Sequence, residues 1–90
     1  MAKIIIPTPL RKFTSNQATI ITKGTTVFEA IQDLAQQHTG IQQHLFDKKG
    51  KIRSFVRIFV GDDDILALNR EKTAVDTSTV ISIIPAIAGG

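Results

Sequence analysis

The chain has 90 residues, 42% of them hydrophobic and 21% charged, and a formal net charge of +3. This length accommodates one domain with a modest core, and this composition excludes disorder and collagen-like repeats. The lack of cysteine excludes disulfides, thiolate metal sites and cysteine nucleophiles. No apolar stretch is long enough for a signal peptide or a membrane span, so we expect a cytoplasmic protein that contacts no membrane.

The first elements expected along the chain are two β-strands. A β-branched run at 4–6 stops at Pro7, and a second β-branched run covers 18–22. The polar stretch 10–17 between them is typical of a connecting loop. Together these segments predict a hairpin with a long loop.

A helix follows the hairpin. Thr26 supplies a hydroxyl and Glu29 a carboxylate three residues later, the pattern of a capping box. Apolar residues at helical spacing then predict a helix over 27–38, ended by a left-handed Gly40. A short second turn at 41–46 is expected to pack beneath this helix.

The second half of the chain predicts further strands at 55–60 and 79–84, the last stopped by Pro85. Between them we expect a turn at 61–64, a brief edge strand at 65–68 and a loop at 69–78. The predicted fold is therefore α+β, a mixed sheet of four to five strands with one main helix on one face. The first and last strands would lie side by side at its centre.

Strand alternation predicts which side chains face the helix. In the strand 55–60, Arg57 cannot be buried unpaired, so its face is expected to be the open one. Extended to the first and last strands, the same alternation gathers apolar residues on the open face, which is typical of a partner-binding surface. The predicted contact residues are Phe59, Arg57, Phe55, Ile84, Val80 and Ile5.

The sequence contains no enzymatic motif or metal site that we can identify. His38 and His44 are spaced poorly for a shared metal, and Asp62–Asp64 lack the other ligands of a calcium loop. The basic run 48–53 is interpreted as a solvated loop, with phosphates or an acidic partner as the alternative. It lacks the interleaved aromatics of a nucleic-acid site. We therefore expect no bound metal, no cofactor and no nucleic acid.

The last five residues differ from the rest of the chain. Ala86, Ile87 and Ala88 are small or apolar, and Gly89 and Gly90 lack side chains. This composition predicts a domain at 1–85 and a flexible tail at 86–90 that is buried in a partner. Two terminal glycines can pass through a narrow channel, so that the carboxylate of Gly90 reaches an active site. Because a carboxylate is a poor electrophile, it would need adenylation before a nucleophile could attack it.

These features resemble a known family, the β-grasp, ubiquitin-like sulfur carriers of the molybdopterin-synthase small-subunit and thiamine-carrier group. The resemblance covers essentially the whole chain and is carried by the helix that begins at Thr26, the segment Phe55-Val56-Arg57-Ile58-Phe59-Val60-Gly61-Asp62 and the ending Ile83-Ile84-Pro85-Ala86-Ile87-Ala88-Gly89-Gly90. Within the group, the Ile-Pro-Thr start at 6–8 and the ending are most similar to carriers that serve cysteine synthesis.

The resemblance implies a protein co-substrate that is not itself an enzyme. A ubiquitin-activating-type adenylating enzyme would use ATP to activate Gly90, and sulfur would then replace an oxygen to give a thiocarboxylate. Gly89, Ala88 and Ile87 would give the tail access to that enzyme. The sulfur would pass to an acceptor on a second enzyme, a pyridoxal-phosphate-dependent cysteine synthase or the large subunit of molybdopterin synthase.

Three other readings of the sequence stay open. One is the small subunit of molybdopterin synthase, one is a ubiquitin-like modifier joined to lysines of target proteins, and one is a plain interaction domain. The sequence does not name the sulfur donor or the acceptor.

Overall fold

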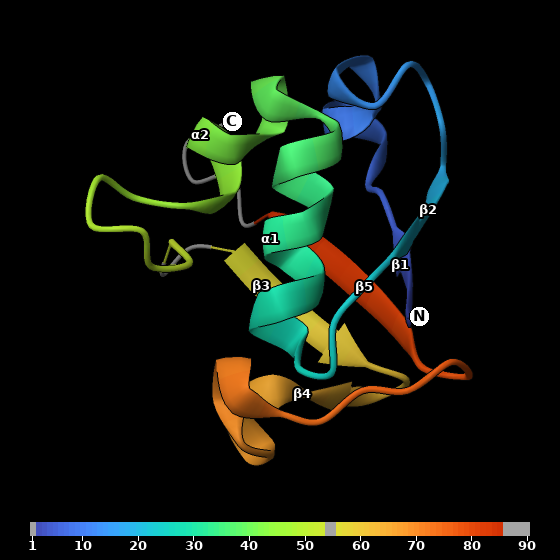
Figure 1. The fold of residues 1–90 in the computed structure, drawn as a ribbon, viewed down its shortest axis with the longest axis vertical. Helices are drawn as coiled ribbons and strands as arrows, with labels where there is room; N and C mark the ends of the chain where they lie inside the picture. Colours follow the sequence, from blue (N-terminus) through green and yellow to red (C-terminus); the bar gives the residue numbers. More distant parts are fainter. Residues whose placement is uncertain (1, 54–55, 86–90) are drawn as a thin grey trace.

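The computed structural model describes residues 2–53 and 56–85, which form a sheet with helices packed on one face (Figure 1). Its strands are β1 (Ala2–Ile5), β2 (Thr19–Thr22), β3 (Val56–Val60), β4 (Asp63–Asp64) and β5 (Val80–Pro85). Its α-helices are α1 (Val27–Gln37) and α2 (Gln42–Leu45), and 3-10 turns cover Thr8–Phe13, Thr39–Ile41, Ile65–Ala67 and Arg70–Lys72.

The strands lie in the order β2-β1-β5-β3-β4. β1 and β5 pair in parallel, and the other neighbours pair antiparallel. This confirms the predicted hairpin of the first two strands and the central position of the first and last. Since β5 is the middle strand, the chain leaves the sheet from its centre.

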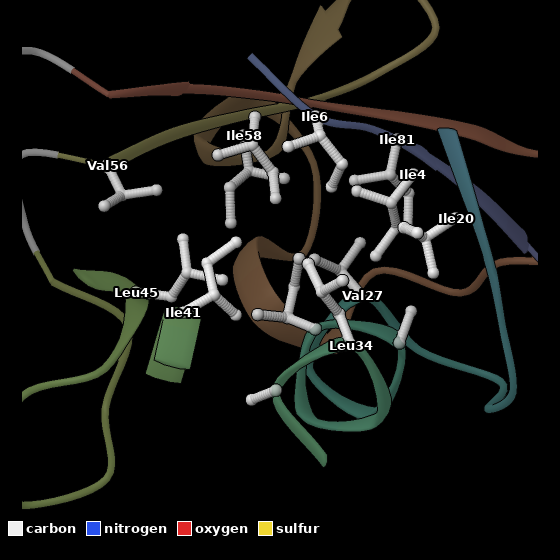
Figure 2. Packing of buried hydrophobic residues seen from close by; sticks show 14 of the residues in the cluster. Ile4, Ile6, Ile20, Val27, Leu34, Ile41, Leu45, Val56, Ile58 and Ile81 are labelled. Carbon is white, nitrogen blue, oxygen red and sulfur yellow. The ribbon is translucent and has the colours of Figure 1, made fainter. Parts of the chain in front are cut away.

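One face of the sheet packs on α1. The alternate strand residues Ile4, Ile20, Ile58 and Ile81 are at most 4% exposed and point toward α1, as Figure 2 shows. The side chains along one face of α1 are buried against these strand residues. Ile41 and Leu45 fill the space beneath Val56. The buried helix residues are Val27, Ala30, Ile31, Leu34 and Ala35. The predicted assignment of faces is confirmed, and so is the short second turn.

α1 begins where the capping pattern predicts. The hydroxyl of Thr26 accepts a hydrogen bond from the backbone N–H of Glu29 at 3.2 Å. The Glu29 carboxylate, however, reaches one residue past the cap and accepts from the N–H of Thr25 at 2.7 Å and from its hydroxyl at 3.0 Å. One free donor of the first helical turn, the Glu29 N–H, and the N–H of the residue before the cap thus acquire partners.

Two sequence expectations are wrong. Gly40 is not left-handed, because the chain continues from His38 directly into the turn Thr39–Ile41, which buries Ile41. Residues 65–68 do not form an edge strand. The Asp64 carboxylate accepts from the N–H of Leu66 at 2.9 Å and so starts a 3-10 turn, and the edge strand is instead the two-residue β4 inside the predicted turn.

The carboxylate of Asp76 organises the turn before β5 and predicts a loss of stability in acid. It accepts from the hydroxyl of Ser78 at 2.8 Å, and also from the Ser78 N–H and the Thr79 hydroxyl, which together lower the pKa of Asp76. A carboxylate with a lowered folded-state pKa contributes stability above its unfolded pKa, and that contribution is lost as pH falls through the folded pKa.

We therefore expect Asp76→Asn to weaken the dependence of the unfolding free energy on pH below about pH 4, the range in which free carboxylates titrate. Urea unfolding of the wild-type protein and of the variant, from neutral pH down to about pH 3, measures this dependence. Identical slopes in the two proteins would contradict the assignment.

Candidate functional site

The predicted reactive tail, with Gly90, Gly89, Ala88 and Ile87, lies outside the described residues, as does Phe55. The structure does place the residue from which the tail starts. Pro85 ends the central strand β5 and lies opposite Val56, the first residue of β3. Any partner that receives the tail must therefore approach this end of the sheet.

The strand register brings the other predicted contact residues together on the outer face, the side of the sheet away from α1. Ile5 lies opposite Ser82, and Ser82 lies opposite Phe59. In the next row toward the end of β5, Arg57 lies opposite Ile84. Side chains of such cross-strand neighbours are in contact range. Five residues from three strands thus form one surface that borders the start of the tail, namely Ile5, Arg57, Phe59, Val80 and Ile84.

This surface is apolar and accessible. Ile5 is 39% exposed and Ile84 is 51% exposed, whereas Phe59 and Val80 are partly buried. Ile21 of β2 is also 51% exposed and extends the surface beyond Lys3, its partner on β1. Sequence reasoning missed Ile21, although the same alternation, with Ile20 buried, would have found it.

Arg57 does not stand alone on the outer face. Its Nη2 donates to Oδ2 of Asp64 at 2.7 Å and its Nε donates to the same oxygen at 3.2 Å. The hydrogen bond from Leu66 N–H, and then the one from Arg57, lower the pKa of Asp64. The sequence placed Asp64 in a solvated turn; in the structure its carboxylate orients the guanidinium beside Phe59.

The remaining candidates supply no catalytic geometry. His38 caps the end of α1, and His44 stacks on Phe13 with ring centroids 4.4 Å apart. A hollow of about 350 Å³ lies along the edge of β3, between Ile52, Ile65 and Arg70. In residues 2–53 and 56–85, no group of three or more histidines and carboxylates could hold a metal ion. Over the same residues, no helix is long and apolar enough to cross a membrane.

The partly buried position of Phe59 predicts different effects on stability and on binding. Phe59→Ala should lower the unfolding free energy by less than about 1.5 kcal/mol, because the ring lies outside the core. Loss of a Phe that is buried in a core costs about 3–5 kcal/mol. It should weaken binding of the partner about tenfold or more if the ring is an anchor of the interface. Thermal or urea unfolding and titration calorimetry measure the two effects.

Phe28→Ala is the matched control. Phe28 packs against the core on the opposite face, with its ring edge-on to Phe46 at 5.9 Å between centroids. This variant should lose more stability than Phe59→Ala and keep partner binding. If the Phe59 variant lost about 3–5 kcal/mol, its ring would belong to the core and not to the docking surface.

The model of the ThiS family matches residues 4–90. The sulfur carrier protein CysO of Mycobacterium tuberculosis (strain ATCC 25618 / H37Rv) is 36% identical over 89 residues, which cover 97% of this chain and 96% of the relative.

Two crystal structures are similar over their full length. One is the BexX/CysO complex of Amycolatopsis orientalis, with a TM-score of 0.88 and 32% identity over all of both chains. The other is CysO of Mycobacterium tuberculosis, with a TM-score of 0.85 and 32% identity over 97% of this chain and 100% of that one. The predicted fold class, a β-grasp of ubiquitin-like type, is confirmed.

Proposed function

This chain belongs to the ThiS family, and from that membership we propose that it is a sulfur carrier protein for cysteine synthesis. The observation that carries the proposal is the 36% identity, over nearly the whole of both chains, to a mycobacterial sulfur carrier protein. The Gly89-Gly90 ending and the central position of β5 support it.

The chemistry proposed for Gly90 has two steps. In the first, an oxygen of the Gly90 carboxylate attacks the α-phosphorus of ATP in the partner enzyme, pyrophosphate leaves, and an acyl adenylate forms. In the second, a hydrosulfide ion attacks the acyl carbon, AMP leaves, the S–H proton is lost, and the terminus becomes a thiocarboxylate. ATP is consumed by the partner, and this chain supplies only the acyl group.

The two parts of the chain have different tasks in this scheme. Residues 86–90 enter the enzyme, and the absence of a side chain at Gly89 lets the terminus pass a narrow channel. The outer face, with Phe59, Ile84 and Arg57, makes the docking contact beside the channel. The chain is thus a co-substrate that acts with two enzymes, one that adenylates it and one, a cysteine synthase-like enzyme, that holds the sulfur acceptor.

Intact-protein mass spectrometry tests the proposal. The purified chain is incubated with lysate of its host, ATP and a sulfur donor, and we expect the mass increase of one oxygen-to-sulfur exchange, dependent on ATP. Adducts with lysines of other proteins would instead support a ubiquitin-like modifier. The thiocarboxylate form is then incubated separately with the purified cysteine synthase-like enzyme and with the large subunit of molybdopterin synthase. Sulfur transfer only to the large subunit of molybdopterin synthase would show that the chain serves molybdopterin synthesis and not cysteine synthesis.

A further inference from the structure

The charged residues of this protein are distributed unequally between the two ends of the sheet. Around the end where β5 stops, the chain carries six cationic side chains and one carboxylate, Asp47. The cationic residues are Arg11, Lys12, Lys48, Lys49, Lys51 and Arg53. They come from two segments that are far apart in the sequence and that sequence reasoning did not connect.

The fold brings these two segments to the same end. β1 runs parallel to β5, so the 3-10 turn Thr8–Phe13 that follows β1 lies at the end of β5. The segment 47–53 follows α2 and leads into β3, whose first residue, Val56, lies opposite Pro85. Stacking of Phe13 on His44 joins the two segments across α2. Figure 1 shows α2 in the upper part of the molecule and β4 at the bottom, with the loop after α2 extending to the left between them.

The carboxylate of Asp47 fixes the backbone of the loop 47–51 and offsets only part of the positive charge around it. The carboxylate Oδ1 of Asp47 accepts from the backbone N–H of Lys49 at 2.8 Å and of Lys51 at 3.0 Å. These backbone bonds, the one from Lys51 first, lower the pKa of Asp47, and the charges of Arg53 and Lys49 lower it further. The loop's one carboxylate is therefore occupied by backbone donors, and in the described part of the chain the ion pair found, Arg57–Asp64, does not involve these lysines.

The opposite end has the reverse charge. Around the β3–β4 turn, the start of α1 and the turn before β5, five carboxylates outnumber four cations. The carboxylates are those of Asp62, Asp63, Glu71, Asp76 and Glu29, and the cations are Lys3, Lys23, Arg70 and Lys72. The molecule thus has an electric dipole whose positive end surrounds the residue from which the tail starts.

We propose that the six cationic residues at the end of β5, together called the basic collar, bind an acidic protein surface around the tail channel of the adenylating enzyme. This inference rests on the proposed function and adds the kind of surface that receives the tail. An acidic rim attracts the positive end of the dipole and so turns the tail toward the channel before contact. The apolar outer face beside the collar then makes the short-range contact.

The positions of the collar residues favour a protein surface over the nucleotide as the occupant. The two segments flank the end of β5 on both sides, and Lys48, Lys49 and Lys51 are exposed. The phosphates of ATP must lie at the far end of the inserted tail, at Gly90, whereas the collar begins at the sheet. Five extended residues span roughly 17 Å, more than a Debye length of about 10 Å at 0.1 M salt.

Two charge-reversal pairs test the collar. Lys48→Glu with Lys49→Glu alters the collar, and Lys23→Glu with Lys72→Glu makes the same change at the other end. Each pair lowers the formal net charge by four, from +3 to −1. ATP–pyrophosphate exchange by the adenylating enzyme of the same genome is measured against carrier concentration, at low salt and at about 0.5 M NaCl, where screening is strong.

We expect the collar pair to lower kcat/KM for the carrier about tenfold or more at low salt, and this difference to shrink at high salt. The control pair should stay within about threefold of the wild-type protein, since its charges lie away from the interface. Both variants should stay folded and unfold close to the wild-type temperature, because all four side chains are exposed and the ion pair found in the described residues involves none of them; Lys49 loses only its Coulombic interaction with Asp47. Lys48→Gln with Lys49→Gln should give an intermediate loss.

Equal losses in the two pairs would overturn the proposal, because net charge and not its position would then matter. A change in the KM for ATP, with the KM for the carrier unchanged, would assign the collar to the nucleotide and also overturn it. A wild-type chain that supports no exchange would instead overturn the proposed function, and the collar's role with it.

Discussion

Deletion of Gly90 is expected to abolish the oxygen-to-sulfur exchange while leaving the fold intact. The shortened chain still ends in a carboxylate, on Gly89, but that carboxylate stops about 3.5 Å short of the place where the original terminus reacts. Attack on the α-phosphorus of ATP requires the reacting atoms to lie within about 3–3.5 Å of each other, so this displacement removes the reaction. Intact mass after incubation with the adenylating enzyme, ATP and a sulfur donor measures the loss.

A second variant distinguishes the length of the tail from its ability to pass through the narrow channel. Gly89→Leu keeps the terminal carboxylate at the right distance and adds a side chain that a channel matched to glycine excludes, so we expect it to be inactive as well. Lys72→Gln, remote from the end of β5, should react like the wild-type protein. Sulfur incorporation by the Gly90 deletion would show that the terminal carboxylate of Gly90 is not the acceptor.

The largest effect on stability is expected from Gly24→Ala. Gly24 has a φ of +121°, a conformation that side chains disfavour, and a Cβ placed there would lie 2.6 Å from Cβ of Glu29 and 3.2 Å from N of Ala30. The substitution adds backbone strain to a collision with the first turn of α1, and we expect it to cost about 2–4 kcal/mol. Urea unfolding measures the change.

Gly50→Ala is the control for this collision. Gly50 also has a positive φ, +80°, but no heavy atom lies within 4 Å of its Cβ position. It should therefore show the backbone cost alone, about 1–2 kcal/mol. Equal losses in the two variants would mean that the close approach between Gly24 and α1 contributes nothing to stability.

These predictions divide the chain into parts that act independently. Gly24 fixes how the hairpin meets α1, the outer face and the collar determine docking, and residue 90 carries the proposed chemistry. A variant of Phe59 or of Lys48 and Lys49 should impair recognition in a protein that is still folded and still has its terminal carboxylate. Partner-binding and sulfur-incorporation measurements on the same variants would show whether the functions separate in this way.

Local patterns predicted most of the fold because they depend on near neighbours in the sequence. The alternation Val56, Arg57, Ile58 indicated which side of β3 is buried, since adjacent strand residues point to opposite faces and an unpaired guanidinium is costly to bury. The Thr26 hydroxyl and Glu29 indicated the start of α1 for a similar reason: a capping bond spans three residues. The same reasoning placed Ile5, Phe59 and Ile84 on one face from alternation within each strand.

The sequence by itself thus determined the faces of the strands, the start of α1 and the family, whereas the tertiary structure decided what depends on distant contacts. Gly40 was predicted to end α1 from its residue type alone, but the burial of Ile41 carries the chain straight into a 3-10 turn. Asp64 found Arg57 only because β4 pairs with β3. The basic collar required β5 to pair with β1 on one side and with β3 on the other; the sequence predicted the first pairing but not the second, and only both together bring residues 11–12 and 48–53 to one end.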